Sequence, residues 1–322
     1  IPNYHPTYDA GSFATQMFTG RAWVFDELKV WITSNRSAGA LVTAPPGFGK
    51  SAIVNRLIRS GNEEGDPFVL GPTVELVAHH MCHAQSGRGT SAANFVSTLL
   101  AQLSASLPTK FAAECQSDAK RAEQLGKQKI EQDPAAAMDA IIAALQSTPA
   151  PLVRGTLQRR LVVVDGIDES SGDSAGSSRL VQCMAKLIKR APKWLAVLCV
   201  SRDVKMVTDE LLPGVSAGQH VSSATGCEHI PLHTVASAAG AAAANDVTDF
   251  IAKYLEQSVN TALAAELHAA DRACEHLPGA ETARERLAAQ SEGNFLWCTT
   301  WLHELKTSGD VAGALHAALM GS

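Results

Sequence analysis

The strongest constraint on the fold is a glycine-rich stretch, Pro45 to Ser51, that separates an apolar run from a helix-forming run. Residues 39–43 (GALVT) have the composition of a short buried strand, and the AIVNRLI segment after Ser51 has the spacing of an amphipathic helix. The predicted order is therefore strand, glycine-rich loop, helix. Glycine allows backbone angles that let successive N–H groups surround a phosphate, and the following helix points its positive end at the same group. The stretch predicts a P-loop, the phosphate-binding turn of nucleotide-binding proteins.

The P-loop pattern G-x-x-x-x-G-K-[ST] is complete except at its first position, where Ala44 stands. We expect this change to be tolerated because Gly47 and Gly49, the glycines nearest the phosphates, are present. Lys50 is predicted to bridge the β- and γ-phosphates, and the hydroxyl of Ser51 is predicted to bind Mg²⁺. The predicted cradle consists of Pro46, Gly47, Phe48, Gly49, Lys50, Ser51 and Ala52.

A second motif, LVVVD at residues 161–165, has the form of a central parallel strand that ends in a carboxylate. Asp165 is predicted to hold Mg²⁺, usually through water, as the acidic residue of a P-loop site does. Asp168 and Glu169 follow at once, and either carboxylate is placed to polarise an attacking water. The sequence does not decide between them, and a surface acidic pair at the start of a helix is the alternative.

The next apolar run, residues 194–201, ends in Ser201 and is followed by Arg202. Because neighbouring parallel strands end at the same edge of a sheet, Arg202 is predicted to sense the γ-phosphate. The alternative is a solvated arginine or one that pairs with a local acid such as Asp203.

Strands that alternate with helices predict a three-layer α/β P-loop core with a mainly parallel sheet, of the ASCE/AAA+-like type, followed by a small all-α domain. HIPL, residues 229–232, is the candidate for a last strand. A helix is predicted behind an Asn245–Asp246 cap. The expected domains are an N-terminal extension at 1–14, the NTPase core at 15–232, an Ala/Gly-rich linker at 233–244 and the helical domain at 245–322.

Composition excludes several classes of function. The net charge of −5 provides no diffuse basic field for holding nucleic acid. No apolar stretch reaches the roughly 20 residues that a membrane span needs. Seven single cysteines without a CxxC spacing indicate reduced thiols, so we expect an intracellular, cytoplasmic protein. The chain begins with Ile rather than Met, and we expect it to be a segment of a longer protein.

With these residues in place, the chain resembles the NACHT-type branch of the STAND P-loop NTPases. Its sequence motifs are most similar to those of the NTPase segment of ankyrin- and tetratricopeptide-repeat scaffold proteins such as the TANC family. Five segments carry the resemblance: FTGRAWVFDEL (18–28), APPGFGKSAIVNRLI (44–58), VAHHMCHAQ (77–85), LVVVDGIDES (161–170) and SEGNFLWCTTWL (291–302).

The resemblance implies a slow, switch-like ATPase that binds ATP or ADP with Mg²⁺ and couples the nucleotide state to protein partners or to self-association. It places the segment from Phe18 to Arg21, with Gly20, against the adenine ring, and the SEGNFL segment in a helical domain that closes over the nucleotide. Asn294 and Phe295 stand where many relatives have a Gly-x-Pro motif. The alternative is a protein-interaction scaffold that is stabilised by bound nucleotide and does not hydrolyse it.

Other readings are weaker. The Asn-Lys-x-Asp motif that reads guanine is absent, which favours ATP over GTP, and the Ala-rich helical part lacks the arginine-rich lid of a small-molecule kinase. His79, His80, Cys82 and His83 do not share one face of a strand, so we expect no zinc site there. Trp297 and Trp301, at helical spacing, are predicted to be core residues.

Overall fold

The computed structural model describes residues 18, 20–34, 36–59, 70–71, 74–82, 89–107, 110–153, 155–170, 178–213, 226–232, 238–257, 261–275, 282–291, 294–307 and 310–320. Within these ranges the chain divides into two compact units. The first contains residues 25–44 and the described part of 57–231, and the second contains the described parts of 18–24, 45–56 and 232–320. The predicted P-loop therefore belongs to the same unit as the C-terminal helices.

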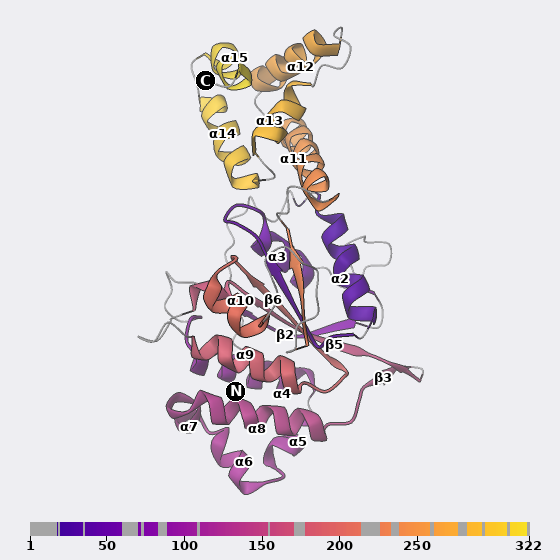
Figure 1. Cartoon of the computed structure of the whole chain (residues 1–322), viewed down its shortest axis with the longest axis vertical. Helices are drawn as coiled ribbons and strands as arrows, with labels where there is room; N and C mark the ends of the chain where they lie inside the picture. Colours follow the sequence, from indigo (N-terminus) through magenta and orange to yellow (C-terminus); the bar gives the residue numbers. More distant parts are fainter. Residues whose placement is uncertain are drawn as a thin grey trace. The chain divides into compact units, whose positions relative to one another are not determined.

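The first unit is built on a five-stranded, all-parallel sheet (Figure 1). The strands, in their order across the sheet, are β2 (Val74–Met81), β5 (Arg159–Asp165), β6 (Leu195–Ser201), β1 (Gly39–Thr43) and β7 (Cys227–Pro231). Strands β1, β5, β6 and β7 are close to the strands predicted from the sequence at residues 39–43, 161–165, 194–201 and 229–232. β6 lies between β1, which leads into the P-loop, and β5, which carries the acidic motif. This order confirms the predicted P-loop-like α/β core.

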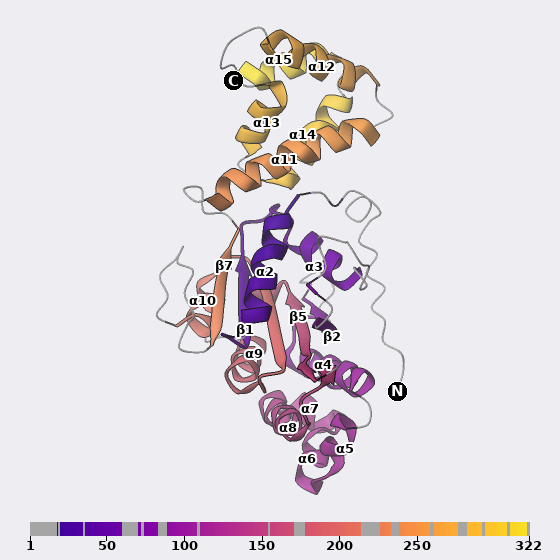
Figure 2. The same ribbon diagram turned by 90° about the vertical axis from the view of Figure 1, so that its right-hand side faces the viewer.

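Helices cover both faces of the sheet. Figures 1 and 2 show α2 (Ala22–Ser34) on one face, and α9 (Arg179–Arg190) with α10 (Lys205–Leu211) on the other. The main apolar core joins strand residues to α4 (Ala92–Ser106), α8 (Pro134–Ser147) and α9. Strand β6 is buried along its whole length, as a strand between two helical layers must be.

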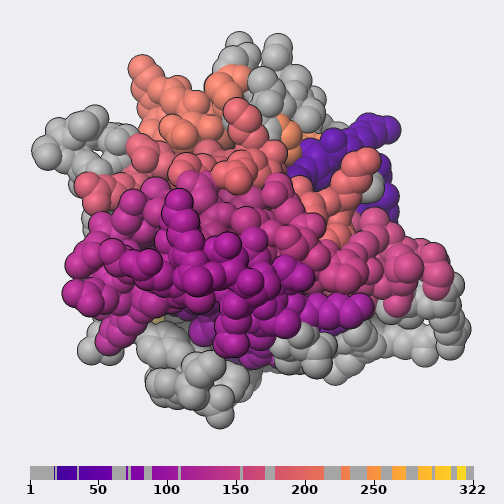
Figure 3. Space-filling model, turned by 90° about the horizontal axis from the view of Figure 1, so that it is seen from below, coloured from indigo at the N-terminus to yellow at the C-terminus, as the bar shows by residue number. Residues whose placement is uncertain are grey.

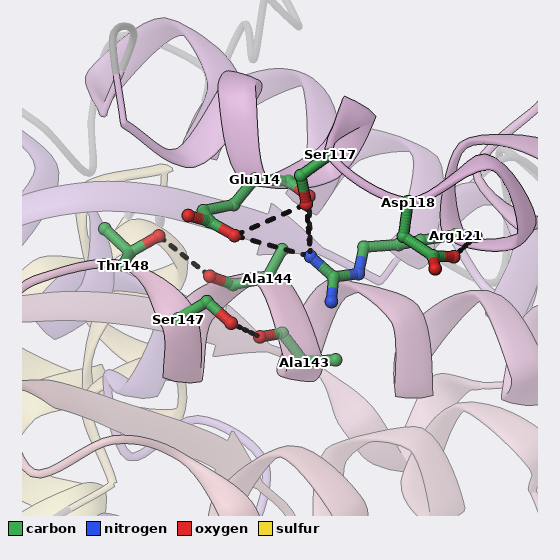
Figure 4. A network of polar contacts seen from close by, with 8 residues as sticks. All are labelled: Glu114, Ser117, Asp118, Arg121, Ala143, Ala144, Ser147 and Thr148. Carbon is green, nitrogen blue, oxygen red and sulfur yellow. Dashed lines mark hydrogen bonds and ion pairs between the residues drawn. The ribbon is translucent and has the colours of Figure 1, made fainter.

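A helical insertion that the sequence pattern does not predict connects α4 to α8. It consists of α5 (Phe111–Gln116), α6 (Ala119–Gln124) and α7 (Lys127–Gln132), and its purple and magenta atoms are prominent in Figure 3. Asp118 caps α6 by accepting the N–H of Arg121 at 2.8 Å. The guanidinium of Arg121 returns to α5, where it donates to the carbonyl of Glu114 at 2.6 Å (Figure 4). These contacts close a turn between helices too short to be stable alone.

A two-stranded antiparallel hairpin, β3 (Leu152–Val153) and β4 (Thr156–Leu157), precedes β5. In the part of the chain that the structure describes, no helix has the length and apolarity needed to cross a membrane.

The second unit is helical at its C-terminal end. Its helices are α11 (Ala238–Gln257), α12 (Thr261–Glu275), α13 (Ala283–Ser291), α14 (Phe295–Thr307) and α15 (Val311–Met320), which pack around a core of their own. This confirms the predicted all-α region. The start of α11 was predicted at the Asn245–Asp246 cap and is wrong. Helix α11 begins at Ala238, because alanine is the strongest helix former and the run before Asn245 is rich in it.

Candidate functional site

The predicted P-loop is a turn between a strand and a helix, with two glycines in the left-handed region. It follows β1 and leads into α3 (Lys50–Arg59), so the predicted order of strand, loop and helix is confirmed. Gly47 and Gly49 have positive φ angles, +84° and +78°, where side chains with a Cβ are strained. The N–H of Ile53 donates to the carbonyl of Gly49 at 3.0 Å, so the loop merges into the first turn of α3. N–H groups in such a first turn have no partner within the helix and suit an anion.

Lys50 and Ser51 occupy the first two positions of α3. The ammonium of Lys50 donates to the carbonyl of Pro45 at 2.8 Å, so it lies over the loop that it is predicted to serve. Ser51 and Ala52 are half-buried. The structure thus brings the predicted cradle residues together in one turn.

Backbone carbonyls of the loop accept hydrogen bonds from residues of the same unit that are distant in the sequence. The side-chain amide of Asn294 donates to the carbonyl of Pro46 at 3.2 Å. The backbone N–H groups of Phe295 and Leu296, at the start of α14, donate to the carbonyl of Gly47 at 2.9 and 3.3 Å.

Arg21 holds the next carbonyl. Its guanidinium donates to the carbonyl of Phe48 at 3.2 Å and lies 4.8 Å from the ring centre of Phe295. It also forms an ion pair with Asp246 on α11, at 3.5 Å, and Asp246 accepts the indole N–H of Trp23 at 3.0 Å. Arg21 is only 1% exposed. Burial lowers the pKa of Arg21 to about 10, with Asp246 opposing the shift, so the guanidinium stays charged at neutral pH.

The segment from Gly20 to Arg21, which the resemblance places near adenine, is shaped by this ion pair. A Cβ on Gly20 would lie 2.6 Å from the side chain of Asp246, and Arg21 itself has a φ of +62°. Burial raises the pKa of Asp246, while Arg21 and Trp23 oppose that shift. The sequence predicts Asp246 to be part of a helix cap, and this is wrong. The structure places it inside α11, where its carboxylate serves Arg21.

The acidic motif belongs to the first unit. Strand β5 ends at Asp165, which is 4% exposed, and Gly166 then turns the chain in the left-handed region with a φ of +71°. The carbonyl of Asp165 accepts the N–H of Cys82 at 2.9 Å, and the N–H of Gly166 donates to Val200 at 3.0 Å. Both neighbouring strands therefore fix the position of this turn at the carboxyl edge of the sheet.

The two carboxylates after Gly166, in the short 3₁₀ helix η2 (Ile167–Glu169), differ in environment. Asp168 is buried and accepts two hydrogen bonds at the end of β6, from the hydroxyl of Ser201 at 3.2 Å and the N–H of Arg202 at 2.9 Å. The guanidinium Nε of Arg202 lies 3.2 Å from Asp168, and its Nη2 lies 3.7 Å from the more exposed Glu169. The structure thus assembles three of the predicted catalytic residues, and Arg202 pairs with them rather than with Asp203.

The strand register aligns the ends of the three strands concerned. Thr43 of β1 pairs with Ser201 of β6, and Asp165 of β5 pairs with Val200. The N–H of Ala44, the residue before the P-loop, donates to the carbonyl of Ser201 at 3.3 Å. The chain therefore enters the loop at the same edge that carries Asp165 and Arg202.

A family comparison bears on this arrangement. Residues 20–202, more than half of the chain, match the family model described as Nephrocystin 3, N-terminal. The chain belongs to this family. No curated protein matches the sequence. The nephrocystin 3 N-terminal segment contains Arg21, the P-loop, the acidic motif and Arg202, whereas Asp246, Asn294 and Phe295 lie beyond it.

Two other sequence patterns have structural explanations. The Nε2 of His80 donates a hydrogen bond to the carbonyl of Gly89 at 2.8 Å, and the imidazole ring packs edge-on against Phe95. Among the described residues no group of three metal-ligating side chains is found, and His83 lies outside them. Trp297 and Trp301 stack at 6.2 Å; Trp301 packs on the helical core as predicted, whereas Trp297 is 37% exposed, so its prediction as a core residue is wrong.

Proposed function

We propose that this chain is an ATP-binding, slowly hydrolysing switch module of the NACHT type, within a larger scaffold protein. The observation that carries the proposal is the strand–loop–helix turn with Gly47 and Gly49 at positive φ and Lys50 over the loop. A turn of this kind presents N–H groups and one ammonium to a phosphate chain.

Two of the predicted site residues carry the kind of oxygen donor that binds Mg²⁺ in a magnesium–nucleotide complex. The hydroxyl of Ser51 and the carboxylate of Asp165 are hard oxygen donors of the kind that Mg²⁺ prefers. A bound Mg²⁺ would neutralise phosphate charge that develops during transfer. The absence of an Asn-Lys-x-Asp motif and the resemblance of the sequence motifs to NACHT-type proteins favour adenine over guanine.

The geometry favours Glu169 over Asp168 as the group that orients water. Asp168 is almost wholly buried and is already held by Ser201 and Arg202, so it has a supporting role. The side chain of Glu169 is 30% exposed, and its ion pair with Arg202 is longer than that of Asp168, at 3.7 Å. We assign Arg202 the role of a cation that lies beside Glu169 and interacts with the γ-phosphate of bound nucleotide.

The second candidate function, a nucleotide-stabilised scaffold without hydrolysis, is favoured by the same ion pair. While Arg202 pairs with Asp168 and Glu169, its guanidinium is held by these two carboxylates and is not directed at a phosphate group. Turnover would then need a partner or a second copy of the chain that draws Arg202 away. Protein partners and self-association through the NTPase domain are part of this proposal.

The deciding experiment measures nucleotide that is released on denaturing the purified protein, the affinity for Mg-ATP by calorimetry, and phosphate release. We expect tight binding in the wild type and in Lys110→Ala, a control for an exposed lysine, and loss of binding in Lys50→Ala. Glu169→Gln should bind normally and lose turnover, while the exposed control Glu131→Gln should retain it. Equal binding by Lys50→Ala and wild type would refute the proposal. Binding without turnover in every variant would support the scaffold reading.

A further inference from the structure

Three consecutive carbonyls of the P-loop accept hydrogen bonds from residues outside the loop. The side-chain amide of Asn294 donates to the carbonyl of Pro46, and the guanidinium of Arg21 donates to the carbonyl of Phe48. The first two N–H groups of α14 donate to the carbonyl of Gly47. These donors are called the loop clamp below, and they comprise Arg21, Asn294, Phe295 and Leu296.

The clamp determines where the loop N–H groups point. No cis peptide occurs in the described chain, and in a trans peptide the carbonyl and the next N–H point in opposite directions. Fixing the carbonyls of Pro46, Gly47 and Phe48 on the clamp therefore turns the N–H groups of Gly47, Phe48 and Gly49 away from it. Successive N–H groups turned to one side form the concave nest that binds phosphate.

We propose that Asn294 and the first turn of α14 are positioning elements for the P-loop, through which the C-terminal helices set its affinity for nucleotide phosphate. This inference rests on the proposed nucleotide binding and adds the means of its regulation. Nucleotide state and the position of α14 are linked through the carbonyls of two loop residues, Pro46 and Gly47. By reciprocity, a partner that moves α14 changes nucleotide affinity, and nucleotide stabilises the first turn of α14.

Asn294 is suited to this position because its amide performs two tasks. Its oxygen accepts the N–H of Trp297 at 3.0 Å, as a helix N-cap does, which leaves the NH₂ group to donate to Pro46. Serine performs the first task but is too short for the second. The packing is close, because a Cβ on Gly47 would lie 2.1 Å from the amide oxygen of Asn294.

The start of α14 depends on the loop in return. The first N–H groups of a helix lack partners within it, and here those of Phe295 and Leu296 use the carbonyl of Gly47. Phe295 also packs edge-on against Phe250 of α11 and lies under Arg21. A shift of α11 or α14 is therefore transmitted to the loop through side chains and backbone together.

The test compares Phe295→Pro with Phe295→Ala. Both remove the ring, but only proline removes the N–H that donates to Gly47, and proline is tolerated in the first turn of a helix. We expect the dissociation constant for Mg-ATP to be about threefold to tenfold higher in the proline variant, with similar melting temperatures. Asn294→Ser, which keeps the cap, should show a similar loss, whereas Ser91→Ala, which removes the cap of α4, should leave affinity unchanged. If hydrolysis is measurable, KM should rise while kcat changes little.

A second readout is hydrogen exchange in the peptide that contains residues 294–298, with and without Mg-ADP. Nucleotide should slow exchange there in the wild type and have no effect in Lys50→Ala. If the wild type binds nucleotide and Lys50→Ala does not, but the proline and alanine variants bind equally well and nucleotide leaves exchange unchanged, the clamp is refuted and the nucleotide site stands. If Lys50→Ala binds as the wild type does, the proposed function fails and the clamp fails with it.

Discussion

Arg202 follows β6 and lies against Asp168, which follows β5. The carboxylate of Asp168 accepts the backbone N–H of Arg202 at 2.9 Å while its second oxygen lies 3.2 Å from the guanidinium. Because Asp168 is buried and Arg202 is half-exposed, the carboxylate is the fixed partner and the arginine is the adjustable one. The contact joins the ends of two neighbouring strands at the edge where β1 enters the P-loop.

Asp168→Ala should destabilise the first unit by about 1–3 kcal/mol, because it leaves the hydroxyl of Ser201 and the N–H of Arg202 without their acceptor. Glu169→Ala should change the free energy of unfolding by less than about 0.5 kcal/mol, since Glu169 is more exposed and forms a longer pair. Urea unfolding of both variants checks the difference. Equal losses would mean that Asp168 is not the structural member of the pair.

Gly166→Ala should be more destabilising than Gly155→Ala. Both glycines have a positive φ, +71° and +80°, so both substitutions strain the backbone by about 1 kcal/mol. A Cβ at position 166 would also lie 2.6 Å from the carbonyl of Cys82, whereas a Cβ at position 155 meets nothing within 4 Å. The difference between the two variants in thermal or urea unfolding isolates the steric part. A Gly166→Ala loss no larger than that of Gly155→Ala would contradict the close packing of this turn.

The sheet and the loop could be predicted because their signals are local. Residues 39–43, 161–165 and 194–201 are apolar runs that end at polar or glycine-rich turns, and a buried parallel strand has this pattern. The loop was recognisable from Gly47, Gly49 and Lys50 alone. The helical insertion at 111–132 was missed because each of its helices has only six residues, too few to show a period.

The partners of the loop could not be predicted, because they depend on tertiary contact. Asn294 and Pro46 are 248 residues apart in the sequence, and an asparagine before an apolar run indicates only a helix cap. The position of Asp246 could not be predicted for the same reason, since an acidic residue after an alanine run is also typical of a helix start. Its contact with Arg21 depends on how residues 20–21 fold against α11. The different environments of Asp168 and Glu169 could not be predicted either, because they depend on burial in the folded chain.

The buried cysteine beside the acidic motif should be unreactive in the native protein. Burial, together with the nearby carboxylates of Asp165, Glu169 and Asp168, raises the pKa of the Cys82 thiol to about 12. Thiolate is the reactive form, so iodoacetamide at pH 8 should label Cys82 far more slowly in the folded protein than in guanidinium chloride. Peptide mass spectrometry after timed labelling measures both rates, and equal rates would contradict the burial.

The same shift predicts a pH dependence of stability. Between about pH 9 and pH 12 the folded protein keeps a proton on Cys82 that the unfolded chain has lost. The native state then binds more protons than the unfolded state, so the free energy of unfolding falls as the pH rises through this window. Cys82→Ala should reduce this slope in urea titrations between pH 8 and pH 10, where the decline begins. An unchanged slope would assign the dependence to other groups.

The ion pair between Arg21 and Asp246 gives the last prediction. Asp246→Ala should destabilise the second unit by about 3–5 kcal/mol, because it leaves the guanidinium of Arg21 buried opposite an apolar side chain. The double variant Arg21→Met with Asp246→Leu should recover most of this loss, since apolar side chains of similar volume need no opposite charge. Urea unfolding followed by tryptophan fluorescence measures the loss of stability in each variant. The double variant should nevertheless bind Mg-ATP less tightly, because methionine cannot donate to the carbonyl of Phe48 as Arg21 does. Recovered stability together with reduced affinity would separate the role of Arg21 in the loop clamp from its role in the core, and recovery of both would limit Arg21 to the core.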